Sequence, residues 1–122
     1  MLIKYWLSKE LPDYEWINPF DSPLTEQWMD RPNAEIARKI VKKDLDLIKH
    51  ADIVIAYLPD VPHLHSIGVP MEIFYARYCL GKPVYVVTPW YHPWLLALEC
   101  NCFATFDDLV RFLRGEEDAS YK

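Results

Sequence analysis

The feature of this sequence that most restricts its fold is an alternation of short apolar runs with helix-length segments. Residues 53–58 and 83–87 are continuous apolar runs rich in β-branched side chains, a pattern typical of central parallel strands that are covered on both faces. Residues 101–104 form a third, shorter run. Strands that alternate with helices predict right-handed crossovers and a parallel sheet between two helical layers.

Four segments have the signatures of helices. Residues 34–50 hold apolar side chains three and four positions apart, and Asn33 is the expected N-cap of that helix. A second helix is expected between Pro70 and Gly81, because proline suits the first helical position and glycine the residue after the end. The other two expected helices are residues 95–98, started by Pro93, and residues 106–113, capped by Thr105.

The N-terminal part is expected to add strands at residues 2–7 and 14–17, and a loop with at most one helical turn at residues 19–32. Together the elements predict an α/β fold in a single domain over residues 1–115. We expect a doubly wound, flavodoxin-like or Rossmann-like sheet of four to five mostly parallel strands. Residues 116–122 are expected to be a polar C-terminal tail.

Composition argues against several classes of function. The 122 residues carry a net charge of −5, whereas proteins that coat nucleic acids or bind anionic membranes need a positive field. The apolar runs are far shorter than the ~18 residues of a membrane-spanning helix, and we expect no signal peptide. Three cysteines without framework spacing favour a reducing compartment. We therefore expect a cytoplasmic protein with neither nucleic-acid polymers nor membranes as partners.

Proline and aromatic residues are both in excess. Ten prolines against three glycines reduce the entropy of the unfolded chain, and with few amide side chains they suggest a thermophilic source. Aromatic residues make up 15% of the chain, more than a core of this size requires. Trp90, Tyr91 and Trp94 form one cluster that can stack on a base, cover the core or line an interface. We expect a homo-oligomer, a dimer or larger, that buries part of this excess.

Asp44 is the first candidate site residue. On a helical wheel it shares a sector with Ile36, Ile40, Val41 and Ile48, whereas Asp46 falls on the opposite face. A carboxylate that faces a core is costly unless it is paired or hydrogen-bonded. Two interpretations stay open, a site residue and a structural residue that caps a loop or pairs with an arginine.

Glu72 is the second candidate. It lies in the first turn of the predicted helix, and the wheel places it beside Tyr75, Ala76 and Cys79. Backbone N–H groups and positive potential at a helix start keep a carboxylate ionised, as a nucleophile requires. The alternative is an ordinary first-turn glutamate that stabilises the helix dipole.

Two loops are where a ligand is expected. In parallel α/β folds ligands bind beyond the carboxyl ends of the strands, and here those ends lead into residues 59–69 and 88–93. Ser66 and Gly68 lie in the first loop, just before Pro70, where a hydroxyl and backbone N–H groups can form an anion pocket. An ordinary turn is the alternative.

Several side chains of metal-binding type occur, but their spacing matches no standard zinc pattern. We therefore expect no metal and no other cofactor, and place these residues on surface loops. A metal-dependent hydrolase is the weakest alternative function. The residues are His63, His65, His92, Cys100 and Cys102.

Four segments, taken in order, resemble the nucleoside 2-deoxyribosyltransferase superfamily, which includes deoxyribonucleoside 5′-monophosphate N-glycosidases. They are a helix end at residues 44–52, an apolar strand at 53–59, the segment Ser66-Ile-Gly-Val-Pro-Met-Glu72, and the turn Gly81-Lys-Pro-Val84. The resemblance covers roughly residues 43–89. It implies that Glu72 is the nucleophile and that Asp44 assists at the base.

In the resemblance, the first residue of the segment 66–72 implies the kind of substrate. Nucleotide-using members carry serine there and bind a 5′-phosphate, and Ser66 is similar to these, because a carboxylate would repel phosphate. Tyr5 matches the tyrosine of the family's first strand, which implies a contact with substrate. The residues after Tyr5 lack the family's loop glycine, and no helix-length segment is expected before Tyr14.

The resemblance therefore implies cleavage or transfer at the N-glycosidic bond of a nucleoside or nucleoside 5′-monophosphate. Glu72 would attack C1′ of the sugar, and water or a second base would release it, as in retaining glycosidases. The alternative is a catalytically silent nucleotide-binding or assembly module of the same fold, which the altered first loop favours.

Overall fold

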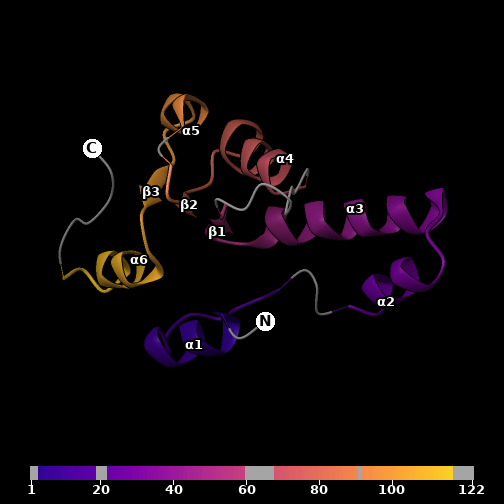
Figure 1. Ribbon diagram of the computed structural model, residues 1–122, viewed down its shortest axis with the longest axis horizontal. Helices are drawn as coiled ribbons and strands as arrows, with labels where there is room; N and C mark the ends of the chain where they lie inside the picture. Colours follow the sequence, from indigo (N-terminus) through magenta and orange to yellow (C-terminus); the bar gives the residue numbers. More distant parts are fainter. Residues whose placement is uncertain (1–2, 19–21, 60–67, 91, 117–122) are drawn as a thin grey trace. The chain divides into compact units, whose positions relative to one another are not determined.

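The computed structural model describes residues 3–18, 22–59, 68–90 and 92–116. The chain divides into two compact units, Met1–His50 and Ala51–Lys122. Figure 1 shows that the strands of these described ranges all belong to the second unit. None of the helices in these ranges is both long and apolar enough to cross a membrane.

The predicted strand at residues 2–7 is wrong, because residues 3–10 form the helix α1, Ile3–Glu10. A short apolar run does not by itself distinguish a strand from a helix. Apolar residues recur here at positions 3, 7 and 11, which is helical spacing, and Leu7 and Leu11 are buried. Tyr5, expected on a strand, therefore lies on a helix, and a helix does precede Tyr14.

Residues 14–17, the second predicted strand, have no regular secondary structure. The indole N–H of Trp16 donates to the carbonyl of Leu11 at 3.3 Å, and the rings of Trp16 and Tyr14 lie 5.6 Å apart. These contacts tie the segment to the end of α1. The strand prediction for residues 14–17 is also wrong.

Helix α2, Pro23–Asp30, lies where at most one helical turn was expected. The Ser22 hydroxyl accepts the backbone N–H of Leu24 at 3.2 Å and caps the helix. Pro23 occupies the first helical position, where its fixed φ and missing N–H cost nothing. This proline therefore starts a helix where it was expected to mark a loop.

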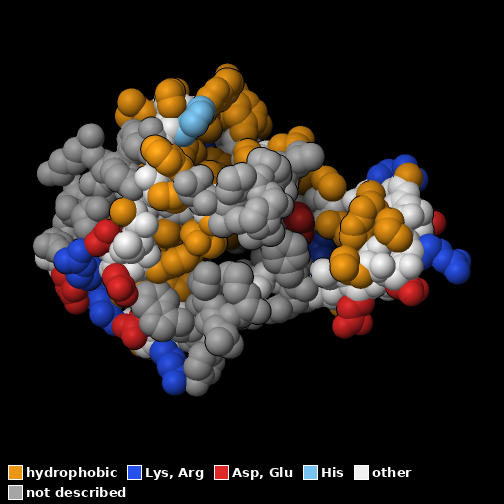
Figure 2. All heavy atoms as spheres, in the orientation of Figure 1, with side chains coloured by type: hydrophobic (Ala, Val, Ile, Leu, Met, Phe, Trp, Pro, Cys, Tyr) orange, Lys and Arg blue, Asp and Glu red, His pale blue; other side chains and the backbone are white. Residues whose placement is uncertain are grey.

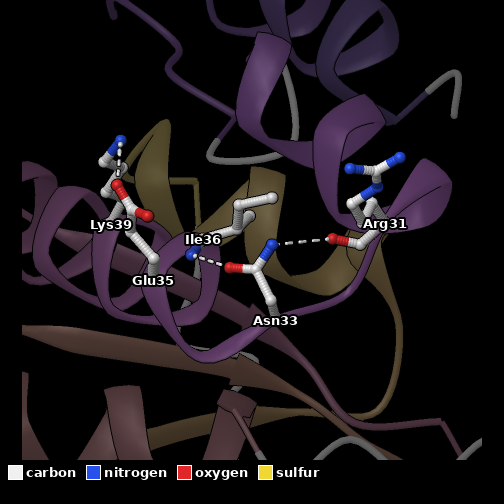
Figure 3. A network of polar contacts seen from close by, with 5 residues as sticks. All are labelled: Arg31, Asn33, Glu35, Ile36 and Lys39. Atoms are coloured by element: carbon white, nitrogen blue, oxygen red, sulfur yellow. Dashed lines mark hydrogen bonds and ion pairs between the residues drawn. The ribbon is translucent and has the colours of Figure 1, made fainter.

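Helix α3, Ala34–His50, has the predicted bounds. Figure 3 shows the predicted N-cap: Oδ1 of Asn33 accepts the N–H of Ile36 at 3.0 Å, and its Nδ2 donates to the carbonyl of Arg31 at 3.2 Å. Lys39 pairs with Glu35 one turn earlier, at 3.3 Å. Helices α2 and α3 pack against each other, so the first unit is a helical unit.

The second unit contains a parallel sheet with the strand order β1-β2-β3. The strands are β1, Val54–Tyr57, β2, Val84–Val87, and β3, Asn101–Phe103. In this register Val54 lies opposite Val84, and Val86 lies opposite Cys102. The mixed α/β class and the parallel sheet are confirmed, with three strands in the described ranges where four to five were expected.

The helix between β1 and β2 changes its winding. Helix α4, Gly68–Phe74, continues into the π-helical turn η1, Tyr75–Cys79. The N–H of Leu80 donates to the carbonyl of Tyr75, five residues back, at 3.1 Å. Gly81 follows the helix, as predicted. Its φ of 67° is the left-handed conformation that glycine commonly takes at this position.

Helix α5, Pro93–Ala97, connects β2 to β3. At its end Glu99 has a φ of 59°, the conformation that glycine usually takes there. The N–H groups of Glu99 and Cys100 donate to the carbonyls of Leu96 and Leu95, each at 3.0 Å. This two-bond C-cap is a Schellman motif with glutamate in the glycine position.

Helix α6, Phe106–Leu113, begins at the predicted cap: Oγ1 of Thr105 accepts the N–H of Asp108 at 3.1 Å. It packs on β2 and β3, where Leu109 joins Val87 and Phe103 in a buried cluster. The side chains of a strand alternate between faces, so Val84 and Val86 point to the opposite face. Helix α4 packs on β1, and Figure 1 shows α4 and α6 on opposite sides of the sheet.

Candidate functional site

The carboxyl ends of β1 and β2 meet at one edge of the sheet. The N–H of Leu58, just after β1, donates to the carbonyl of Val87 at 2.9 Å, and the N–H of Thr88 donates to the carbonyl of Phe103 at 2.9 Å. The loops that follow β1 and β2 therefore start side by side, as the predicted parallel sheet requires. This is the edge at which parallel α/β sheets bind ligands.

Glu72 lies in the second turn of α4, the helix that follows β1 in the described part of the chain and packs on it. The buried side chains of Ile73 and Ala76 fix which side of the helix faces the sheet, and Glu72 beside them is half-buried. Its Oε1 lies 3.5 Å from the position that a β-carbon on Gly68 would take. The carboxylate thus bends back toward the start of its own helix.

Of the three predicted neighbours of Glu72, two are at least half-buried and the third is exposed. Ala76 is buried and Tyr75 is half-buried, but Cys79 is exposed. A helical wheel assumes 100° per residue, whereas the π turn of η1 adds a residue to the turn and rotates the side chains after it. Cys79 therefore points to solvent.

Asp44 is half-buried on α3, and Asp46 is exposed, in agreement with the predicted wheel. Burial raises the pKa of the Asp44 carboxyl above its ordinary value of 3.8, and the neighbouring Lys43 partly offsets this rise. Val41, expected on the apolar side of the helix, is 55% exposed. The buried side of α3 is therefore narrower than predicted, and Asp44 lies on it.

The remaining predicted site residues are Ser66 and Tyr5. Ser66 lies outside the residues that the structure describes, and Tyr5 lies on α1. Asp44 and Tyr5 belong to the first unit, and Gly68 and Glu72 belong to the second. Gly68 and Glu72 are thus the predicted site residues that the structure places together.

The metal interpretation gains no support from the described residues, among which no group of three or more His, Cys, Asp or Glu is arranged to hold a metal ion. His63 and His65 lie outside these residues. The Nδ1 atom of His92 accepts the N–H of Trp94 at 3.3 Å and caps α5. Cys100 and Cys102, which were expected on surface loops, are buried, and Cys102 lies on β3. Burial raises the pKa of the Cys100 thiol, and it raises the pKa of the Cys102 thiol to about 11.

Thr88 is a residue that the sequence analysis did not single out. It follows β2, is 4% exposed, and its hydroxyl accepts the N–H of Trp90 at 3.3 Å. It shapes the start of the loop that follows β2. A polar residue directly after the central apolar run is the signal that would have identified it.

Comparisons of this chain with models of protein families, with curated proteins and with solved structures found no match.

Proposed function

We propose that this protein cleaves or transfers at the N-glycosidic bond of a nucleoside or nucleoside 5′-monophosphate, with Glu72 as the nucleophile. The observation that carries the proposal is the position of Glu72, half-buried at the start of α4 with its carboxylate beside Gly68. A sugar can approach closely a carboxylate that lies against a residue without a side chain, on the helix that follows the first strand of a parallel sheet. The segment resemblance supports the same assignment.

The proposed reaction has two displacements at C1′ of the sugar. A Glu72 oxygen forms a bond to C1′ while the C1′–N bond breaks, and the bonding electron pair leaves with the base nitrogen, which is protonated. The role of Asp44 as the residue that assists at the base stays a prediction of the resemblance. Water or the nitrogen of a second base then attacks C1′ and restores the carboxylate, with overall retention of configuration.

Ser66 and Gly68 are proposed to contact the 5′ side of the substrate, where a hydroxyl tolerates a phosphate that a carboxylate would repel. Tyr5 has no role in this proposal, because its assignment depended on a first strand that is a helix. We keep as predictions a single domain over residues 1–115, a doubly wound arrangement of the sheet, and a cytoplasmic location.

A catalytically silent nucleotide-binding module is the second candidate. The helix α1 favours it, because the strand and loop from which a first-strand tyrosine would reach substrate are replaced by helical backbone. Binding that depends on Ser66 and Gly68 does not require that strand.

Incubation with each deoxynucleoside 5′-monophosphate, followed by chromatography of released base, separates the two candidates. Released base that increases with enzyme and time supports the glycosidase or transferase. A second free base in the mixture distinguishes transfer, which forms a new nucleotide, from hydrolysis. Binding by calorimetry without released base would support the module and reject the enzyme.

A further inference from the structure

The helix formed by α4 and η1 exposes an uncharged surface. Met71 is 66% exposed, Phe74 40% and Tyr78 71%, and the rings of Phe74 and Tyr78 stack with centroids 4.8 Å apart. An amphipathic surface helix normally turns charged or polar side chains to solvent. The exposed residues of 68–81 are Gly68, Pro70, Met71, Phe74, Tyr78, Cys79 and Gly81.

The two charged residues of this stretch, Glu72 and Arg77, are both half-buried. Glu72 bends back toward Gly68. Arg77 donates from Nε to the carbonyl of Leu98 at 2.8 Å and pairs with Glu99 at 3.2 Å. Lys82 donates to the carbonyl of Ala51, just before β1.

Helix α5 extends the apolar surface. Its end is joined to η1 by the two Arg77 contacts, and it exposes Trp94 at 67% and Leu96 at 59%. Figure 2 shows hydrophobic side chains gathered over α4 and α5. We call this surface the α4–α5 face; it consists of Met71, Phe74, Tyr78, Trp94 and Leu96.

We propose that the α4–α5 face is the surface through which two copies of this chain form a symmetric dimer. Its five large residues expose roughly 600 Å² of mostly apolar surface, most of the ~800 Å² that each partner contributes to a stable interface. An exposed apolar patch of this size is uncommon on a monomer. The face is thus large enough to drive association.

The chemistry of the face favours a second copy as its occupant. Two identical surfaces can meet about a two-fold axis only if their charges do not repel, and the five residues of this face carry no charge, on a chain whose net charge is −5. Homodimer interfaces are also more apolar than those of transient complexes between different proteins. The proposal goes beyond the catalytic one and does not depend on it.

A matched pair of substitutions tests the interface. Met71→Lys places a charge in the α4–α5 face, and Met29→Lys makes the same change on α2, where Met29 is 77% exposed. Sedimentation velocity over a protein dilution series is expected to give dimers for the wild type and Met29→Lys. A charge inside the interface should raise the dimer dissociation constant of Met71→Lys by about 100-fold or more.

The same series of measurements includes a control for folding and a second variant. Both methionines are mostly exposed, so far-UV circular dichroism should be unchanged, and Tyr78→Lys provides a second variant if Met71→Lys does not fold. A wild type that stays monomeric at about 100 μM would overturn the proposal, whatever its activity. Dimers of equal strength in the wild type, Met71→Lys and Tyr78→Lys would overturn it too, because the interface would lie elsewhere.

Discussion

Oε1 of Glu72 lies 3.5 Å from the position that a β-carbon on Gly68 would occupy. The two residues are four apart, so one turn of α4 brings the carboxylate over the glycine backbone. The backbone of Gly68 does not take the left-handed conformation that only glycine adopts easily. The glycine is therefore not required by the turn, and its missing side chain leaves space beside the carboxylate.

Gly68→Ala should separate stability from activity. The methyl group would make an ordinary contact, and alanine lowers the entropy of the unfolded chain, so the free energy of unfolding should be unchanged or rise by about 0.4–1 kcal/mol. The same methyl group would crowd the approach to Glu72 and reduce kcat/KM for base release by about tenfold or more. Urea titration and base-release kinetics measure the two effects, and undiminished kcat/KM would show that substrate does not pass this glycine.

Ser66→Ala should weaken the binding of nucleoside monophosphates by about tenfold or more, because a charge-assisted hydrogen bond contributes roughly 1.5–3 kcal/mol. Binding of the corresponding nucleoside, which lacks the phosphate, should hardly change. Calorimetric titration with the matched pair of ligands measures this difference. Equal losses for both ligands would place Ser66 away from the phosphate.

Asp44→Asn should stabilise the protein at neutral pH. Burial raises the folded-state pKa of Asp44 above 3.8, so the folded state holds this proton more tightly and stability falls as pH rises through the raised pKa. Asparagine removes that cost, and its advantage should shrink as the pH falls toward 3.8. Urea titrations at pH 7 and pH 4 test this, with Asp46→Asn as the control on the exposed side of α3. If Asp44→Asn is less stable at pH 7, the carboxylate makes a stabilising ion pair.

Glu99→Gly and Glu99→Ala should differ in stability. Both remove the exposed ion pair with Arg77, which contributes at most about 1 kcal/mol. Only glycine relieves the positive φ of 59° at this C-cap, so Glu99→Gly should be more stable than Glu99→Ala by about 1 kcal/mol. Thermal or urea unfolding measures the difference, and equal stabilities would show that the left-handed conformation costs little here.

The second unit was predictable because its local signals agree with its packing. The β-branched runs became β1 and β2, Thr105 caps α6, and Gly81 ends the helix between the first two strands. The first unit was less predictable. The run at residues 2–7 fits either a helix or a strand, and Pro23 starts a helix when a serine cap precedes it.

The candidate site was predictable only in part. Glu72 and Gly68 lie in one contiguous segment, so helical spacing alone brings them together. The exposure of Cys79 was not predictable, because a π turn has no clear sequence signature and changes the direction of every side chain after it. The burial of Thr88 depends on the pairing of β2 with β3, which lies outside its own segment.

The most direct test of the central claim is the rate of base release by Glu72→Gln, measured with its substrate affinity. The substitution keeps the size of the side chain but replaces the carboxylate with a neutral amide, which is a far weaker nucleophile. The rate should therefore fall by about 10³-fold or more while nucleotide binding stays within about threefold. Glu99→Gln, an exposed glutamate of the same unit, should retain the wild-type rate. A Glu72→Gln variant that releases base at the wild-type rate would contradict the assignment of Glu72 as nucleophile.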